Sequence, residues 1–371
     1  MSSKQKPKIF IYGATGYTGQ LVAELAAKQA ANAVLGGRDE EKLSELGNRL
    51  NLPSRCLSLQ DSATLLDAVR EFDVVLNLAG PYRHTAAPMR AACIATRVHY
   101  VDITGELEVF EDHAQFHDRA RLAGITLLSG AGFDVVPSDC LAAHVSSRVE
   151  NAEKLEMYFS GGVGMSRGTM RSGLGMIGGG VPIRENGRLI RRLVSEGRSR
   201  DCGDGEQRFC AGPWGDLVTA WHSTRIPNIQ VFFPTKKEPA SRAVLFAKAF
   251  LLNRKFVQWL LRGFIRLLPN GPEAEARDTA RQYLLAEVTN ARGETYSARL
   301  ETPEAYTLTA YTALAVAEAV VDPSVPRGYQ TPATALGANF ILQFPGVSRE
   351  DAAPSRPGIK AGVSAGETSI A

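Results

Sequence analysis

A chain of 371 residues has room for about two domains, and its composition, 44% hydrophobic and 22% charged, is that of an ordinary globular protein. This composition excludes an intrinsically disordered chain, and a net charge of +3 is too small to indicate nucleic-acid binding. The five cysteines include no CxxC pair, so we expect a reduced cytoplasmic protein without a metal site.

Strands and helices alternate through the first 137 residues. Short apolar runs predict buried strands at 8–12, 33–36, 74–78, 98–102 and 125–129. Helices are predicted between them, at 20–31, 40–50, 63–70, 88–95 and 111–123. This alternation is typical of a doubly wound parallel sheet. We therefore predict an α/β protein whose residues 1–137 form a Rossmann domain.

The pattern changes after residue 137. We expect a helix at 139–148, a half-exposed strand at 154–160, a β-hairpin of strands 283–288 and 295–300, and an Ala-rich helix at 306–320. Residues 138–327 are thus predicted to form an α+β domain with a mainly antiparallel sheet, which we assign to substrate binding and dimerisation. Residues 328–348 are apolar enough to pack back on the chain. Residues 349–371, rich in Pro, Ser, Gly and Ala, are predicted to be a flexible tail.

Three glycines follow the first predicted strand directly and open the first helix. Glycine allows a tight turn and a close approach of the backbone to a pyrophosphate, whose charge the helix N-terminus stabilises. The spacing is GxxGxxG and a plain glycine turn is the alternative, but the strand–turn–helix context favours a dinucleotide site. We expect contacts to the cofactor from Gly13, Ala14, Thr15, Gly16, Tyr17, Thr18 and Gly19.

The end of the second predicted strand, Gly36-Gly37-Arg38, indicates which dinucleotide is bound. An NAD site usually places Asp or Glu here for the ribose 2′-hydroxyl, whereas the guanidinium of Arg38 can bind a 2′-phosphate bidentately. Asp39 is adjacent and weakens this argument, although it could equally cap the helix that begins at Glu40. We predict NADP(H) in preference to NAD(H), with Gly37 and Arg38 in the site.

The predicted strand at 74–78 ends in Asn77-Leu-Ala79-Gly80-Pro-Tyr82. Ligands of doubly wound sheets lie beyond the carboxyl ends of the strands, so Asn77, Ala79, Gly80 and Tyr82 are expected near the cofactor. A simple strand-end turn is the alternative for Asn77 and Gly80.

A reductase must orient the acceptor and supply a proton while its cofactor supplies the hydride. Three candidates for this role are Tyr82, Asp102 and His222. Tyr82 could instead pack against the cofactor, and Asp102, like Glu106, could cap a helix or anchor a loop. His222 is the group most suited to titrate near pH 7, with a structural histidine as the alternative.

Residues 242–266 contain no Asp or Glu, and basic side chains recur there at helical spacing among Leu, Phe and Trp. Such a segment suits the surface of a membrane or a hydrophobic ligand. An ordinary packed helix or an interface between two copies of the chain fits the same pattern. No apolar leader and no stretch of about 18 uncharged apolar residues is present, so we expect neither a secretory signal nor a transmembrane helix.

Together with the glycine loop and the strand ends, several segments resemble the saccharopine dehydrogenase-like oxidoreductases, in the branch that includes the trans-acting enoyl reductases. They include HYVDITGE at 99–106, GAGFDVVPSD at 130–139, GDLVT at 215–219 and HSTRIPN at 222–228. The resemblance implies a Rossmann domain, a substrate domain, a C-terminal segment that returns to the first domain, and hydride transfer from NAD(P)H. Two departures, Arg225 in place of a glycine and Glu301–Glu304 in place of a glycine-containing turn, bear on the substrate.

These features lead to one preferred function and two alternatives. We expect an NADPH-dependent reduction of an activated C=C bond in a hydrophobic, acyl, polyketide-type or lipid-like small molecule, and no nucleic-acid partner. The first alternative is reduction of a C=N bond, which would require groups that bind amino-acid carboxylates. The second is a non-catalytic NADP-binding protein at lipid surfaces.

Overall fold

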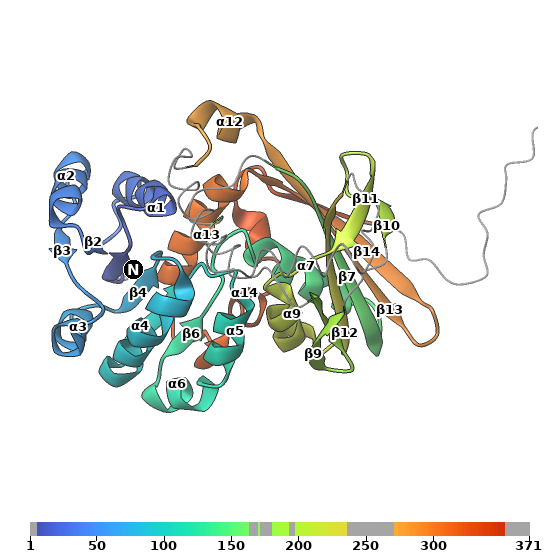
Figure 1. The fold of residues 1–371 in the computed structure, drawn as a ribbon, viewed down its shortest axis with the longest axis horizontal. Helices are drawn as coiled ribbons and strands as arrows, with labels where there is room; N and C mark the ends of the chain where they lie inside the picture. Colours follow the sequence, from blue (N-terminus) through green and yellow to red (C-terminus); the bar gives the residue numbers. More distant parts are fainter. Residues whose placement is uncertain (1–5, 163–169, 171–179, 193–196, 236–270, 353–371) are drawn as a thin grey trace, which may run out of the picture.

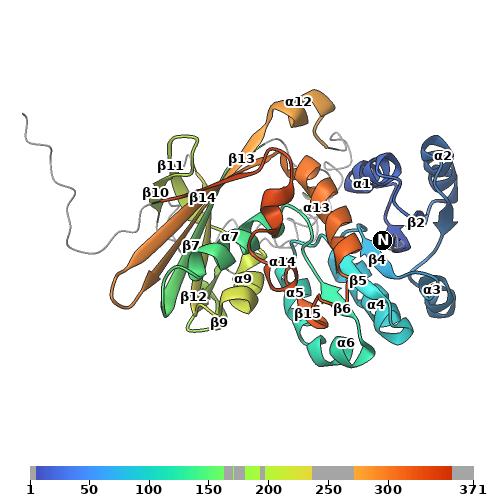
Figure 2. The same ribbon diagram turned by 180° about the vertical axis from the view of Figure 1, so that it is seen from behind.

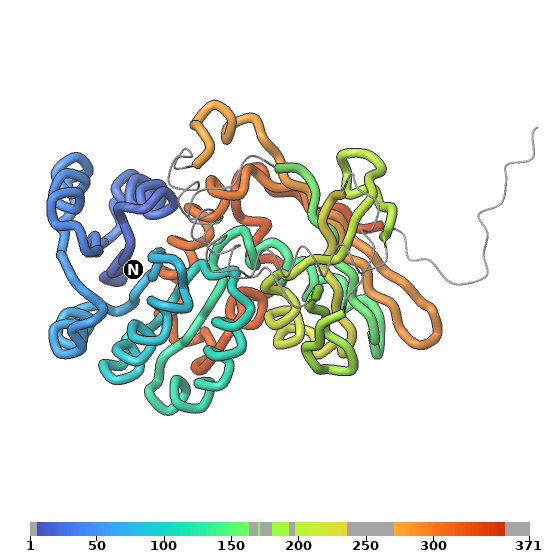
Figure 3. Tube along the Cα trace, in the orientation of Figure 1, coloured from blue at the N-terminus to red at the C-terminus, as the bar shows by residue number. Residues whose placement is uncertain are grey.

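A computed structural model describes residues 6–162, 170, 180–192, 197–235 and 271–352. Two sheets lie side by side along the longest axis of the molecule, and the helices α7 (Val136–Ser146) and α9 (Asp216–Thr224) lie between them (Figure 1). The last part of the chain, orange and red in Figure 3, runs between the two halves. The protein is thus an α/β protein with a second sheet domain, as predicted.

The first sheet is parallel throughout and has the strand order of a Rossmann fold extended at one edge. Within the described residues its order is β15 (Gly328–Gln330), β6 (Thr126–Leu128), β5 (His99–Asp102), β4 (Val74–Asn77), β1 (Ile9–Tyr12), β2 (Ala33–Gly37) and β3 (Ser54–Cys56). Strands such as β1 and β4 are apolar at nearly every position because both faces of the sheet are buried. In this register the last residues of β1, β4 and β5 lie at the same edge.

Helices cover both faces of this sheet. On one face lie α1 (Tyr17–Lys28), α2 (Glu40–Leu50) and α13 (Ala305–Ala319), and on the other lie α3 (Ser62–Val69), α4 (Tyr82–Thr96) and α6 (His117–Ala123). The short helix α5 (Leu107–Ala114) follows β5. Small side chains, among them Ala23 of α1 and Ala313 of α13, are fully buried and let helices of this layer approach closely.

The position of α13 differs from the predicted division at residues 138–327. The helix is continuous in sequence with the second domain, but its buried face belongs to the core of the first sheet. Its Ala-rich composition predicts a helix without saying which sheet it covers. The first domain is therefore completed by residues from late in the chain, α13 and β15.

The second sheet is mixed and mainly antiparallel. Its strands run in the order β10 (Arg198–Asp201), β11 (Glu206–Ala211), β12 (Asn228–Pro234), β7 (Ala152–Gly161), β13 (Arg281–Asn290), β14 (Thr295–Pro303) and β16 (Ser348–Asp351). The hairpin β8 (Val181–Glu185) and β9 (Arg188–Arg192) is attached to β12, and only the β12–β7 pair is parallel among the described pairs. One face packs on α7 and α9 through alternate residues such as Leu155, Met157 and Phe159.

The C-terminal residues connect the two sheets (Figure 2). After β15 come α14 (Pro332–Leu336) and the short helix η1 (Phe340–Gln343), and then β16 pairs with β14. The predicted start of the flexible tail at Arg349 is therefore wrong for its first residues, because Arg349–Asp351 complete a sheet edge. The carboxylate of Asp351 also lies 2.7 Å from Nε2 of His144 on α7.

Two sequence predictions lie outside the described residues, the basic segment 242–266 and the rest of the tail, 353–371. In the part of the chain that is described, no helix has the length and apolar character needed to cross a bilayer.

Candidate functional site

The loop between β1 and α1 has the geometry of a dinucleotide-binding turn. Gly13 has a φ of +90°, and a Cβ there would lie 2.7 Å from the backbone nitrogen of Ala79, so only glycine fits. A Cβ at Gly19 would overlap the carbonyl oxygen of Gly13, so the third glycine lets α1 pack on the turn. Gly16 is exposed and precedes the first residue of α1.

The N-terminus of α1 can accept an anion. No side chain caps its first turn, and no acidic residue lies there. The amides of such a turn carry partial positive charge and favour a phosphate. The loop therefore fits the pyrophosphate of a dinucleotide, and it would be held by the backbone of residues 13–19.

Arg38 and Asp39 at the end of β2 have separate roles. The side chain of Arg38 is exposed. Asp39 is the N-cap of α2: its carboxylate accepts the amide of Lys42 at 3.2 Å and lies 2.6 Å from the Lys42 ammonium. These contacts hold the pKa of Asp39 below its usual value. The alternative that Asp39 caps a helix is thus confirmed, which leaves Arg38 free to meet a 2′-phosphate.

The end of β4 lies directly against the glycine loop, since Gly13 approaches the backbone of Leu78 and Ala79. Asn77 is fully buried; its side-chain amide donates to the hydroxyl of Tyr100 at 3.2 Å, and its oxygen accepts the amide of Ala79 at 3.2 Å. Asn77 therefore stabilises the turn through these two hydrogen bonds. Gly80, in contrast, is exposed. Contact between the cofactor and Ala79 or Gly80 stays a prediction.

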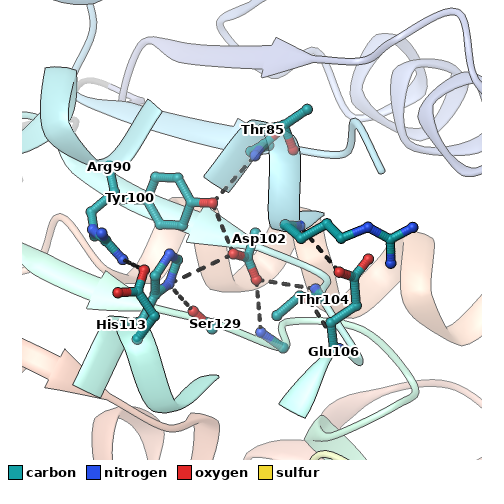
Figure 4. Close-up of polar contacts among 12 residues, drawn as sticks. Thr85, Arg90, Tyr100, Asp102, Thr104, Glu106, His113 and Ser129 are labelled. Atoms are coloured by element: carbon teal, nitrogen blue, oxygen red, sulfur yellow. Dashed lines mark hydrogen bonds and ion pairs between the residues drawn. The ribbon is translucent and has the colours of Figure 1, made fainter. Parts of the chain in front are cut away.

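Asp102 forms the centre of a buried polar network at the ends of β5 and β6 (Figure 4). One carboxylate oxygen accepts the Tyr100 hydroxyl at 2.8 Å, and the other accepts the amides of Thr104 at 3.0 Å and Gly130 at 3.1 Å. Burial raises the pKa of Asp102 to about 6, although these hydrogen-bond donors act to lower it. Because the side chain is 0% exposed, the geometry favours the loop anchor over the catalytic acid.

His113 and Ser129 complete this network. The Nδ1 atom of His113 lies 2.6 Å from the Ser129 hydroxyl and 3.9 Å from Asp102. Burial lowers the pKa of His113 to about 3, so its ring is neutral at physiological pH. The network is therefore a buried support for the strand ends.

Tyr82 begins α4 and is buried at 7% exposure, with its ring beside Gly80. The Glu106 carboxylate accepts the amides of Tyr82 at 2.9 Å and Arg83 at 3.1 Å, and so caps α4 from a neighbouring loop. Burial raises the pKa of Tyr82 well above its usual value, and the charges of nearby carboxylates raise it further. These surroundings favour packing of Tyr82 over proton donation, although its catalytic role stays a prediction.

Asp134, in the loop after β6, is a half-buried residue. Its carboxylate lies against Gly105, where a Cβ would come within 2.5 Å of Oδ2. The loop is fixed from both sides, because the Phe133 amide donates to the Thr309 hydroxyl at 2.9 Å and Ala131 donates to the carbonyl of Asp102 at 2.7 Å. Burial raises the pKa of Asp134 to about 6. A carboxyl of this kind can donate a proton near neutral pH.

Two further carboxyls lie behind Asp134, and both are fully buried. Asp139 accepts the Ser223 hydroxyl and, at 2.7 Å, the amide of Ala333, which ties α7 to α9 and α14. Asp216 has no hydrogen bond of normal geometry within the described residues, and burial raises its pKa well above the usual range. The edge of the first sheet that faces the second domain is thus rich in carboxyls.

His222 lies near the end of α9 and packs against β15 of the first sheet. Its ring packs edge-on against Tyr329 at 5.0 Å, at the end of α9 opposite to Asp216. Burial lowers the pKa of His222 to about 4, and the charges of Arg225 and Arg184 lower it further. The arrangement favours the structural histidine that the sequence left as an alternative.

The two departures from the family pattern are both at helix ends. Arg225 is the C-cap of α9 with a φ of 61°, a left-handed conformation in which glycine is usual. Glu304 is the N-cap of α13, and its carboxylate accepts the amides of Tyr306 and Thr307 at 2.9 Å each. Both residues thus have a local role at a helix end, and their bearing on the substrate stays a prediction.

Two hollows lie outside the edge with the carboxyls. One of about 440 Å³ lies beside the glycine loop and is lined by Thr15, Lys42 and Arg49 among others. The other, about 510 Å³, lies on the second sheet and is lined by Arg184, Arg198 and Phe232 among others. No residue at the carboxyl ends of the first sheet's strands lines the larger hollow. We therefore do not assign it as the reaction site, although it is the larger of the two.

Sequence comparison matches the first domain. The family model of the saccharopine dehydrogenase NADP binding domain matches residues 9–128. A saccharopine dehydrogenase-like oxidoreductase of Mus musculus is 31% identical over 160 residues, 38% of this chain and 37% of that protein. A trans-acting enoyl reductase of Mycobacterium leprae is 34% identical over 154 residues, 39% of this chain and 37% of that protein. The chain thus matches little more than a third of either relative's length.

Comparison of structures extends the likeness over nearly the whole chain. The apo saccharopine dehydrogenase (L-Glu forming) of Saccharomyces cerevisiae superposes with a TM-score of 0.60 at 13% identity, covering 93% of this chain and 99% of that one. The homospermidine synthase of Legionella pneumophila, in complex with NAD, has a TM-score of 0.59 at 9% identity, covering 91% and 88%. At these identities the likeness shows the fold, with its two sheets, and nothing about the substrate.

Proposed function

We propose, on the premise that residues 9–128 of this chain are a saccharopine dehydrogenase NADP-binding domain, that the protein is an NADPH-dependent reductase of an activated C=C bond in an acyl or lipid-like substrate. The cofactor supplies a hydride when bound. The residues of the chain must hold the acceptor and supply the proton.

One observation carries this proposal: the loops that follow β4, β5 and β6 contain carboxyls but neither Lys nor Arg. Residues 77–80, 102–106 and 129–135 include Asp102, Glu106 and Asp134 but neither Lys nor Arg. An edge of this kind disfavours a substrate that carries several carboxylates, because like charges repel. The substrate of an amino-acid imine reductase has such groups, whereas the acyl part of an enoyl substrate has none.

Asp134 is the carboxyl that we place as proton donor. Its partial exposure, its fixed loop and its raised pKa meet the three requirements of access, position and protonation state. Phe133, its neighbour in the chain, is buried in the core between α7 and the second sheet, with its ring 6.4 Å from that of Phe159, which helps to fix the loop.

The relatives agree with this choice in part. A protein named trans-acting enoyl reductase is 34% identical over 154 residues. A protein named saccharopine dehydrogenase-like oxidoreductase is 31% identical over 160 residues. Reduction of a C=N bond in a substrate without carboxylates is therefore the second candidate.

Consumption of NADPH tests the two candidates. The purified chain is mixed with NADPH and either enoyl thioesters of increasing chain length or imines formed from amino acids and oxo acids. We expect turnover of the enoyl thioesters. Turnover of the imines alone would reverse the assignment, and tight NADPH binding without turnover of any substrate would favour a non-catalytic protein.

The basic segment 242–266 lies outside the described residues, and from its sequence we propose that it contacts anionic membrane surfaces, where a lipid-like substrate would be found. Vesicles that contain phosphatidylserine should sediment the wild-type protein. Replacement of Arg262 and Arg266 by Glu should release it. A wild type that never sediments with such vesicles would end this proposal.

A further inference from the structure

Tyr17 connects the glycine loop to the second domain. It is the first residue of α1, and its hydroxyl donates to the carbonyl of Pro272 at 2.6 Å, 255 residues later in the chain. Its ring packs edge-on against Tyr306 of α13 at 5.0 Å. Gly271 lies so close to the ring that a Cβ there would be 2.6 Å from it. The segment 271–279, which contains α12 (Ala274–Thr279), thus packs against Tyr17 at the end of the glycine loop, residues 13–19 (Figures 1 and 2).

Arg277 of this segment is held at the same place. One of its terminal nitrogens donates to the Tyr17 hydroxyl at 2.9 Å and to the carbonyl of Pro272 at 3.0 Å. Both acceptors are neutral groups, so within the described residues no carboxylate neutralises the guanidinium. Among the described residues no hydrogen-bond partner is found for the other guanidinium nitrogens, which can donate to a further acceptor because the fork carries five N–H donors.

The location of the Arg277 guanidinium points to a ligand because the phosphate-binding turn of α1 lies next to it. Tyr17 belongs to the first turn of α1, whose uncapped amides fit the pyrophosphate. A half-buried arginine that is fixed by two hydrogen bonds loses little conformational freedom when it binds an anion, so more of the ionic interaction appears as affinity.

We propose that Arg277 binds the pyrophosphate of the dinucleotide from the second domain and that Tyr17 is the residue that positions it. The cofactor is then held between two parts of the chain that are far apart in sequence, the glycine loop and the segment 271–279. The inference rests on the dinucleotide site and is independent of which bond is reduced.

The proposal makes a prediction that differs from that for Arg38. The pyrophosphate is common to NAD and NADP, so loss of Arg277 should weaken the binding of both dinucleotides by the same factor. The ligand 2′-AMP carries the adenosine and the 2′-phosphate without a pyrophosphate, and its affinity should not change.

Titration calorimetry with NADP⁺, NAD⁺ and 2′-AMP tests the role of Arg277. For Arg277→Gln we expect the Kd of both dinucleotides to rise about tenfold, the usual effect of one charge-assisted hydrogen-bond pair. Arg277→Lys should recover part of the affinity because it restores the charge without the fork. Tyr17→Phe should weaken both dinucleotides about threefold, since it removes one of the two bonds that hold the guanidinium.

Arg281→Gln is the matched control. Arg281 is exposed, directly follows the segment, and lies 3.7 Å from Glu301, so the same loss of charge there should leave every Kd within about twofold of the wild type. The weakening by Arg277→Gln should also shrink at high salt.

Three results would overturn the proposal. One is an unchanged Kd of NADP⁺ and NAD⁺ in Arg277→Gln. Another is a loss confined to NADP⁺ and 2′-AMP, which would assign the arginine to the 2′-phosphate. The third is an equal weakening of 2′-AMP with a lowered melting temperature in both the Gln and Lys variants, which would make Arg277 a structural brace only.

Discussion

The backbone amide of Gly130 donates a hydrogen bond of 3.1 Å to the carboxylate of Asp102, which ties the loop after β6 to the last residue of β5. The same carboxylate accepts Tyr100 and Thr104. We expect Asp102→Ala to lower the free energy of unfolding by at least about 3 kcal/mol, because it leaves three buried donors unpaired at about 1–3 kcal/mol each. Urea denaturation followed by fluorescence measures this difference.

Asp67→Ala is the control for that experiment. Asp67 is 77% exposed and, among the described residues, pairs only with Arg70 at 3.4 Å, so its loss should change the free energy of unfolding by less than about 0.5 kcal/mol. If Asp102→Ala were as stable as this control, the network could not be the support that we describe.

Replacement of the proposed proton donor, Asp134→Asn, should lower kcat about a hundredfold, at the lower end of the range for general acid catalysis. The pKa of Asp134 is raised to about 6, and an acid must be protonated to act. The wild-type kcat/KM should therefore fall as the pH rises through about 6, and this limb should be absent from the variant. An unchanged pH profile in Asp134→Asn would assign the proton to another group.

The same carboxyl affects stability with a definite sign. Its pKa is raised on folding from 3.8 to about 6, so the folded protein holds the proton more tightly than the unfolded chain does. This contribution to stability is fully present below about pH 3.8 and is lost as the pH rises through about 6. Relative to the wild type, Asp134→Asn should gain stability between pH 4 and pH 7, as thermal melts across this range would show.

His222 should have no titration near neutral pH. Burial lowers its pKa to about 4, so the ring is already neutral at pH 6. We expect the His222→Asn variant to retain the pH dependence of kcat/KM, with kcat within about threefold of the wild type, since no general acid or base is lost. Proton NMR of the imidazole gives an independent test, and a midpoint between pH 6 and 7 would restore His222 as a candidate.

Local patterns predicted the first domain well. Each predicted strand before residue 137 corresponds to a strand, and α2 begins and ends as predicted, at Glu40 and Leu50. The reason is that buried parallel strands are largely apolar and that Gly13 and Gly19 occupy positions where a Cβ would overlap neighbouring backbone. The single helix predicted at 111–123 is instead two helices, α5 and α6, and α4 begins at Tyr82, six residues before its predicted start. The short strand β3 was missed, because its residues Ser54–Cys56 are partly exposed and show no apolar run.

Long-range contacts were beyond the reach of these patterns. The sequence shows that Tyr17 follows a glycine loop, but nothing near Arg277 reveals that the two side chains meet 260 residues apart. Asp102 and Asp134 both follow predicted strands, and only their exposure separates the anchor from the candidate acid. Burial depends on the tertiary fold. The sequence therefore predicted which edge of the sheet holds the site, but not which of the two carboxyls is the proposed proton donor.

Arg38→Ala tests the assignment of the 2′-phosphate. Arg38 is exposed at the end of β2, while Asp39 is engaged as the cap of α2 and by the Lys42 ammonium at 2.6 Å. A guanidinium that binds a phosphate bidentately contributes two charge-assisted hydrogen bonds, so we expect the Kd of NADP(H) to rise at least about thirtyfold. NAD(H) lacks the 2′-phosphate, and its Kd should stay within about twofold of the wild type because no contact is lost.

Arg70→Ala is the matched control for Arg38→Ala. Arg70 is the C-cap of α3, is 67% exposed and is paired with Asp67 at 3.4 Å, so its loss removes the same charge from the same domain away from the hollow beside the glycine loop. If the general positive potential governed affinity, both variants would weaken NADP(H) alike. A selective effect of Arg38 requires a direct contact with the phosphate that distinguishes the two dinucleotides, whereas equal losses of NADP(H) and NAD(H) in Arg38→Ala would show that the guanidinium makes no such contact.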